Sequence, residues 1–344
     1  MNDLPIDILL QLLSREHPAS VFRLRRLCKA VLIVLESSAF ARLSLQWHSI
    51  DHLDPRLWIN APSAFQGIYA QRCSATTTTL TLAFQHSLSI PLSVSLFSNL
   101  SRFELFNSHL SRALPIELFH LASLKTWCLW GTRLPADHDS ELSVIPYHIG
   151  RFTSLLHLEM KDCHLSLNFP KSLESLTKLS NLNVSRNNLC GPIPAPTFAP
   201  LEHLQNLNLS SNRFTGIIPN ILSRFISLQV LDLSRNSFTC KIPDMSLLVN
   251  LRHLDLSYNA LHGQIPMTLC GCALLEVLYL NDNALEGALP EEVGQLESLE
   301  RLRFAGNAGM EGVEVPVGVC LLDALVECDV EAVVLVLPEN AWEE

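Results

Sequence analysis

The sequence lacks the features that mark membrane-spanning, nucleic-acid-binding and secreted proteins. Its apolar run AVLIVL at 30–35 is far short of the roughly 20 residues that span a bilayer. The formal net charge is −10, and residues 286–344 hold 14 acidic residues against two arginines, so no basic patch is present. The first seven residues include Asp3 and Asp7 and no Lys or Arg, unlike a secretory signal. These absences predict no membrane span, no nucleic-acid partner and a cytoplasmic or nuclear location.

Catalytic and metal-binding signatures are also missing. There is no Gly-rich phosphate loop, no His-Glu-x-x-His motif and no nucleophile elbow. Asp137-His138-Asp139 has acid–base and metal-ligating groups, but a charged triplet in a loop is more often solvated. The ten cysteines stand singly, and Cys270-Gly-Cys272 has no second pair at zinc spacing, which indicates thiols in a reducing compartment. We therefore expect no enzyme activity, cofactor or metal.

What the sequence has instead is one phrase repeated at a fixed period. LNLSSN at 207–212 returns as LDLSRN at 231–236 and LDLSYN at 254–259. The marker asparagine recurs in steps of 23 to 25 residues at Asn187, Asn212, Asn236, Asn259, Asn283 and Asn307. Weaker copies place Ser108, Thr132 and Cys163 at the same position, and LTL at 80–82 precedes them.

This period predicts a solenoid, because stacked turns share a core that no single turn can form alone. The Leu-x-Leu pair alternates like a short strand, so both leucines of a pair point to one face. The asparagine has a different predicted role. Its side-chain amide is expected to bond backbone groups where the chain bends, one rung per turn, because an unpaired buried group is costly.

The full unit, L-x-x-L-x-x-L-x-L-S-x-N-x-L-x-G-x-I-P, resembles the plant-type subclass of leucine-rich repeats over roughly residues 76–330. The resemblance implies an α/β fold: a leucine-rich-repeat solenoid with a curved parallel β-sheet on its concave face and an outer layer from the Gly-x-Ile-Pro part. A small N-terminal helical unit would precede it. The resemblance implies a binding scaffold and no chemistry.

Residues 3 to about 43 have helical spacing of their apolar side chains. Their order, DLPIDILLQLLSR, VFRLRRLCKAV and ESSAF, resembles the F-box motif, a trihelical unit that docks a Skp-type adaptor of a cullin–RING ubiquitin ligase. Two departures are Val31, where the family has Trp, and Glu16-His17-Pro18, where Leu-Pro is expected. The alternative is a plain helical cap on the first repeat. The residues that would contact the adaptor are Leu4, Pro5, Ile8, Leu9 and Leu27.

The sequence thus predicts an F-box-like helical unit at 1–43, a linker and N-terminal cap at 44–75, the solenoid at 76–330, and a C-terminal cap with an acidic tail at 331–344. The predicted function is protein binding as the substrate-recognition subunit of a cullin–RING (SCF-type) ubiquitin ligase. The alternative is a non-ligase scaffold, or a receptor- or inhibitor-like recognition protein at the membrane or cell exterior. By resemblance to secreted relatives, Cys320 and Cys328 would then form a capping disulfide, although Cys328 aligns with an inward strand position.

The variable residues between the fixed leucines are expected to face an unknown protein partner on the concave side. The step from Thr132 to Cys163 is 31 residues, so an insertion between Leu134 and Ile145 should leave the stack as a loop near Trp130. The alternative is that the early tryptophans only pack inside irregular repeats. The predicted partner-binding residues are Phe106, Trp130, His157, Glu159, Asp232, Asp255, Tyr258 and Tyr279.

Overall fold

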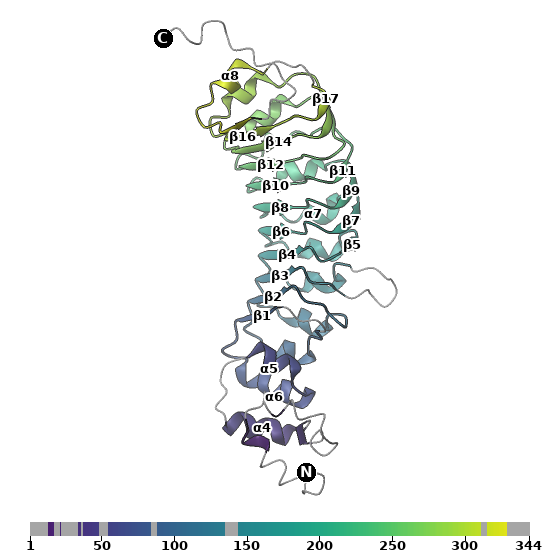
Figure 1. Cartoon of the computed structure of the whole chain (residues 1–344), viewed down its shortest axis with the longest axis vertical. Coiled ribbons are helices and arrows are strands. Elements are labelled where there is room, and N and C mark those ends of the chain that lie inside the picture. The colour runs from purple at the N-terminus through teal and green to yellow at the C-terminus, as the bar shows by residue number, and fades with distance from the viewer. Residues whose placement is uncertain are drawn as a thin grey trace. The chain divides into compact units, whose positions relative to one another are not determined.

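The computed structural model describes residues 13–16, 21, 34–35, 37–47, 54–83, 88–134, 144–310 and 315–328. The chain forms two compact units, Met1–Pro135 and Ala136–Glu344. Within each unit, successive turns contain one strand of a main parallel sheet, and the turns repeat along the chain (Figure 1). The predicted α/β solenoid is confirmed.

Short helices precede the sheet in the first unit. They are α4 (Ser38–Trp47), α5 (Pro55–Asn60) and α6 (Ser63–Cys73). α5 begins at a proline, and the Asp54 carboxylate caps it by accepting from the backbone N–H groups of Arg56 at 2.9 Å and Leu57 at 3.2 Å. α5 contacts β1 (Thr79–Ala83), so the edge strand is covered. The sequence analysis did not predict α5 and α6.

Buried aromatic side chains fix these helices. The Trp58 ring lies 5.2 Å from the Phe97 ring, and its indole N–H donates to the Ser93 hydroxyl oxygen at 3.2 Å. The Tyr69 hydroxyl accepts from the backbone N–H of Asp54 at 2.7 Å. Burial raises the pKa of Tyr69 to about 12. Each polar group on these rings is therefore bonded although the rings themselves are buried.

The main sheet of the first unit has the order β1, β2 (Arg102–Phe106), β3 (Thr126–Trp130). The strands are parallel and in register, with Phe103 paired to Trp127 and Leu105 to Leu129. These four side chains are buried. The connections contain the 3-10 helices η2 (Leu92–Leu96) and η3 (Ile116–His120).

The main sheet of the second unit is also parallel, and its eight strands pair in chain order. Leu231 pairs with Leu207 on one side and Leu254 on the other, and all three are fully buried. The last strand places Cys328 beside Leu302, at the inward position that the sequence predicted. The strands are β4 (His157–Lys161), β6 (Asn181–Asn183), β8 (Asn206–Asn208), β10 (Val230–Asp232), β12 (His253–Asp255), β14 (Val277–Tyr279), β16 (Arg301–Arg303) and β18 (Glu327–Cys328).

A second layer of short strands lies after the marker asparagines. One sheet contains β5 (Ser166–Leu167), β7 (Asn188–Gly191), β9 (Arg213–Gly216) and β11 (Ser237–Phe238), and another contains β13 (His262–Gly263), β15 (Asn283–Glu286) and β17 (Asn307–Gly309). Gly216 and Gly263 have φ of 77° and 80°, which glycine adopts without strain. Cys240 stands at this position between them and is not among the residues with positive φ. The layer is interrupted at that turn, between β11 and β13.

The returning segments and phenylalanine rings fill the space between the two layers. The Phe214 ring is stacked on that of Phe169 at 5.7 Å and on that of Phe238 at 6.4 Å. These rings continue the core in their turns, and the buried Leu189 and Leu261 take the place of Phe214 and Phe238 in other turns. The returning segments contain η4 (Tyr147–Arg151), η5 (Lys171–Ser175), α7 (Ala195–Phe198), η6 (Asn220–Arg224), η7 (Met267–Gly271), η8 (Glu291–Gln295) and α8 (Val317–Cys320).

The marker asparagines form the predicted ladder of hydrogen bonds. The Asn236 amide donates to the backbone carbonyls of Leu209 and Leu233, both at 3.0 Å. Its side-chain carbonyl accepts from the backbone N–H of Phe214, also at 3.0 Å. One side chain thus joins two turns and pairs backbone groups that the bend leaves without strand partners. Equivalent bonds are made by Asn187, Asn212, Asn259, Asn283 and Asn307.

Candidate functional site

The candidate site is the outward face of the two main sheets. We call it the sheet face and define it as the outward strand side chains together with the residue before each ladder position. In β2, Phe103 and Leu105 are buried, while Arg102, Glu104 and Phe106 point outward. Because the strand period is two and the leucines point inward, the residues between them belong to this face.

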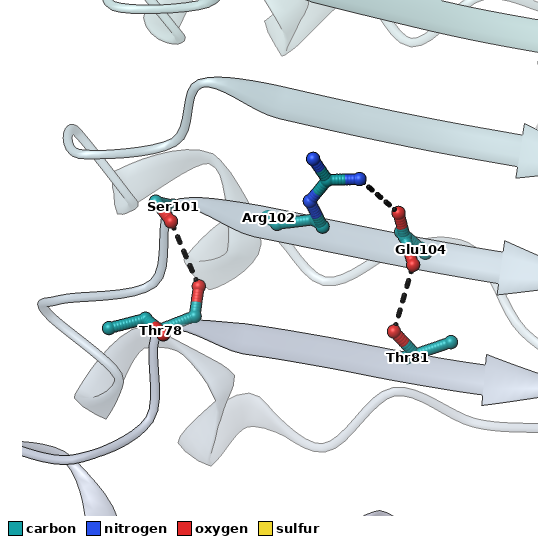
Figure 2. A network of polar contacts seen from close by, with 5 residues as sticks. All are labelled: Thr78, Thr81, Ser101, Arg102 and Glu104. Carbon is teal, nitrogen blue, oxygen red and sulfur yellow. Dashed lines mark hydrogen bonds and ion pairs between the residues drawn. The ribbon is translucent and has the colours of Figure 1, made fainter.

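In the first unit the sheet face begins with a polar network (Figure 2). The Glu104 carboxylate is paired with the Arg102 guanidinium at 2.9 Å and accepts from the Thr81 hydroxyl on the neighbouring strand, also at 2.9 Å. The Ser101 hydroxyl donates to the Thr78 carbonyl at 3.0 Å. Glu104 is therefore neutralised and held in place, so this part of the face carries no unpaired carboxylate.

Beyond this network the first unit presents an aromatic pair. Phe106 and Trp130 are adjacent in register, and their rings meet edge to face with centroids 6.3 Å apart. Trp130 is 48% exposed, while Trp127 on the same strand is fully buried. The Trp127 ring packs on that of Phe119 at 5.9 Å. The two tryptophans thus have opposite roles, since one belongs to the core and the other to the sheet face.

In the second unit the predicted partner-binding acids carry structural hydrogen bonds. One oxygen of Asp232 accepts from the backbone N–H and the hydroxyl of Ser234, at 3.1 and 2.6 Å. The other oxygen accepts from the Asn208 amide at 2.9 Å. Asp255 bonds Ser257 in the same way, at 2.9 and 2.6 Å. These acids close a tight turn two residues on, a role that the sequence analysis did not assign to them.

Asp232 and Asp255 also lie side by side in the register of β10 and β12. Burial raises the pKa of the Asp255 carboxyl, and the neighbouring Asp232 carboxylate raises it further, although the bonds from Ser257 oppose this shift. Glu159 and His157 lie on β4, where Glu159 accepts from the Asn183 amide at 3.4 Å. Of the predicted acids, Glu159 is thus the one with the longest hydrogen bond.

Aromatic and cationic side chains gather on β12, β14 and β16 and on the turns that follow β10 and β12. The Tyr279 ring lies 6.1 Å from the His253 ring and 4.9 Å from the Arg303 guanidinium carbon. Arg303 is also paired with Glu327, its Nε donating to the carboxylate at 2.6 Å. Tyr258 is 44% exposed, and the Arg235 guanidinium carbon lies 4.2 Å from its ring centre. The structure therefore places Tyr258 beside Arg235, and Tyr279 beside His253 and Arg303.

The residue before each ladder position has a left-handed backbone, which the sequence analysis missed. Its φ lies between 46° and 69° in nine successive turns. Glycine, asparagine and aspartate tolerate this region best, and their recurrence at this position was the signal that could have revealed it. The residues are Asn107, Gly131, Asp162, Arg186, Ser211, Arg235, Tyr258, Asp282 and Gly306.

Models of known families match two parts of the chain. The model described as leucine rich repeat matches residues 202–261, and a second model of the same description matches residues 274–296. Together with the stacked parallel turns and the asparagine ladder, these matches decide the fold. The fold is a leucine-rich-repeat solenoid.

Solved structures support this assignment. The leucine-rich-repeat chain is 26% identical to the plant peptide hormone receptor RGFR1 in complex with RGF2 (TM-score 0.63), covering 76% of this chain and 40% of that one. It is also 26% identical to the Arabidopsis receptor kinase HAESA in complex with the peptide hormone IDA and the co-receptor SERK1 (TM-score 0.61), covering 78% and 47%. A leucine-rich-repeat protein of Leptospira interrogans, 22% identical with a TM-score of 0.59, shares the fold over 83% of this chain and 76% of its own. The chain thus spans less than half of either plant receptor chain. No curated protein sequence matches it.

Several predicted features of the leucine-rich-repeat chain lie outside the described residues. They include the insertion at 135–143 with Asp137-His138-Asp139. Within the described part, no group of three His, Cys, Asp or Glu side chains is placed to hold a metal ion, and no helix has the length and apolarity to cross a membrane. All five predicted adaptor-binding residues also lie outside the described ranges: Leu4, Pro5, Ile8, Leu9 and Leu27.

Proposed function

We propose that this leucine-rich-repeat chain is a recognition module without catalytic activity that binds an extended peptide segment of a partner protein on its sheet face. Trp130 is the observation that carries the proposal, because its indole is 48% exposed on a strand whose inward residues are fully buried. Large exposed aromatic rings are common anchors of binding energy, since each buries much apolar area on contact.

Two further observations support a peptide as the ligand class. The two plant receptors that are 26% identical to this chain were each solved in complex with a peptide. The second unit also offers two sets of aromatic and cationic side chains in contact, Arg235 with Tyr258, and Tyr279 with His253 and Arg303. These observations favour the receptor-like alternative over the ligase adaptor.

Selection of peptides from a phage-displayed library of random 12-residue sequences tests the proposal. The wild-type chain should enrich a family of related peptides. The double variant Trp130→Ala, Phe106→Ala should bind the enriched peptides more than tenfold more weakly, with a nearly unchanged melting temperature. The matched control is Tyr147→Ala, because Tyr147 is 69% exposed but lies on η4, away from the sheet face.

Each outcome has a clear meaning. Failure to enrich any peptide family contradicts the proposed function. If the double variant unfolds, the two rings belong to the core, and if it binds as tightly as wild type, the anchor lies around His253, Tyr258 and Tyr279. Loss of binding in the Tyr147 variant would show that the peptides bind outside the sheet face.

The ligase function stays a prediction from the F-box-like sequence. Replacing Leu4, Pro5 and Leu9 with charged or small residues should abolish co-purification with a Skp-type adaptor and leave the repeats folded. The control is the unsubstituted chain. If that chain does not retain the adaptor either, the N-terminal segment is a cap.

A further inference from the structure

The left-handed positions of the second unit hold side chains that this backbone does not favour. Asp and Gly occupy three of the seven positions, as expected for positive φ. Arg186, Arg235 and Tyr258 have φ of 57°, 54° and 55°. The left-handed conformation is unfavourable for such residues, because their side chains cannot stabilise it by a local hydrogen bond as Asn and Asp do. Three such residues within four successive turns of one face point to a role for their side chains.

The backbone holds these residues in a regular row. The N–H of Arg186 donates to the Ser210 carbonyl and that of Arg235 to the Ser257 carbonyl, both at 2.9 Å. Ser211 stands between them, one turn from each, and makes the same bond to Ser234 at 2.9 Å. With about 4.8 Å between neighbouring turns, Arg186 and Arg235 are about 10 Å apart along the sheet face.

The Arg235 guanidinium is oriented but not neutralised. It lies over the Tyr258 ring at 4.2 Å, and such stacking occupies the face of the guanidinium and leaves its N–H edge open. Both arginines are exposed, and neither has an ion-pair partner within the described residues. Arg303 differs, because it stacks on Tyr279 and is already paired with Glu327.

Asp232 on the same face does not form an ion pair with either arginine. Asp232 is bonded through both oxygens to Ser234 and Asn208. The cationic edge of this row is therefore available, and a carboxylate is the group that matches it, because a planar guanidinium edge can donate two parallel N–H bonds to one carboxylate.

We propose that Arg186 and Arg235, the latter held by Tyr258, bind carboxylate side chains of an acidic peptide segment. The inference rests on the proposed function and specifies the chemistry of its ligand. Charge complementarity selects this occupant, because two arginines that have no ion-pair partner among the described residues stand in one row beside an aromatic ring.

The same 12-residue phage library, with wild-type chain and variants, tests this inference. Peptides enriched by the wild type should share Asp or Glu at one or more fixed positions. Replacing those acids by Asn or Gln in a synthetic peptide should weaken binding roughly tenfold, as expected for a hydrogen-bonded charge pair. Arg235→Gln should cause a loss of similar size, Arg235→Lys a smaller one, and Tyr258→Phe little, since the phenylalanine ring still supports the guanidinium. The matched control is Arg213→Gln, which removes the same charge from β9 in the outer layer.

A double-substitution cycle identifies the contact. The Asn or Gln peptide should bind wild type and Arg235→Gln about equally, because the charge pair is already absent once the peptide carboxylate is removed. Enriched peptides without a common acid, or equal losses in Arg235→Gln and Arg213→Gln, would overturn the inference and leave the proposed function intact. Enrichment of no peptide at all would contradict both.

Discussion

Asn187 should hold two turns of the solenoid together, and replacing it tests that role. Its side-chain carbonyl accepts from the backbone N–H groups of Cys163 and Leu165, both at 3.0 Å. Its amide donates to the carbonyls of Met160 at 2.6 Å and Val184 at 2.8 Å. All of these bonds are buried. Because the Asn212 amide also donates to the Val184 carbonyl at 3.0 Å, Asn187→Ala removes the partner of three groups, the N–H groups of Cys163 and Leu165 and the Met160 carbonyl.

The expected loss follows from these three groups. Each buried group left unpaired costs about 1–3 kcal/mol, and water that enters the vacated space recovers part of this. We therefore expect Asn187→Ala to lower the free energy of unfolding by about 3–5 kcal/mol. The chain offers a graded variant, because Thr132 occupies the same position in the first unit and its hydroxyl donates to Leu105 at 3.1 Å. Asn187→Thr should lose less than Asn187→Ala.

Guanidinium unfolding followed by circular dichroism measures the shift in midpoint, and hydrogen exchange reports the Cys163 and Leu165 amides directly. The control is Asn250→Ala, since Asn250 is exposed and makes one bond to the Ile226 carbonyl at 2.8 Å. A midpoint shift in Asn187→Ala no larger than in this control, with both amides still protected, would refute the ladder argument.

Three further predictions concern packing and titration. Leu207→Ala should cost about 2–5 kcal/mol in unfolding experiments because Leu207 is fully buried, whereas Ile217→Ala, at a side chain 64% exposed, should cost less than about 0.5 kcal/mol. Burial raises the thiol pKa of Cys270 and Cys272 to about 11, so their reactive thiolate forms only as the pH approaches that value. Peptide mapping after iodoacetamide treatment at pH 8 should find the exposed Cys190 and Cys320 labelled first, and equal early labelling of Cys272 would contradict the burial. Of the four tyrosines, Tyr69 should be the last to ionise in an ultraviolet titration, near pH 12, and Tyr69→Phe should remove that late step.

The repeated parts of the fold could be predicted because equivalent positions of each turn need the same types of residue. The leucine rows and the asparagine ladder recur in register, and even Cys328 lies at its expected inward position. Helices α5 and α6 could not be predicted in this way, because they occur once and their packing depends on single contacts, of Trp58 with Ser93 and of Tyr69 with Asp54.

The candidate site was predictable only in part. Alternation placed Trp130 and Phe106 outward, but spacing alone could not distinguish Trp127 from Trp130 until the strand register was known. Spacing did not reveal that Asp232 bonds the serine two residues on, because the same residue types suit a binding surface. The left-handed positions could not all be recognised from residue type alone, because Arg186, Ser211, Arg235 and Tyr258 interrupt the pattern of glycine, asparagine and aspartate there.

The central claim is that ligand binds the sheet face, and hydroxyl-radical footprinting of the wild-type chain with and without an enriched peptide tests it most directly. The peptide should protect at least one of Trp130, Tyr258 and Tyr279 from oxidation. Tyr147 and Met267, which are 69% and 61% exposed away from the sheet face, should be oxidised as fast as in the free chain. Protection of Tyr147 or Met267 without protection of any of the three sheet-face residues would contradict the account.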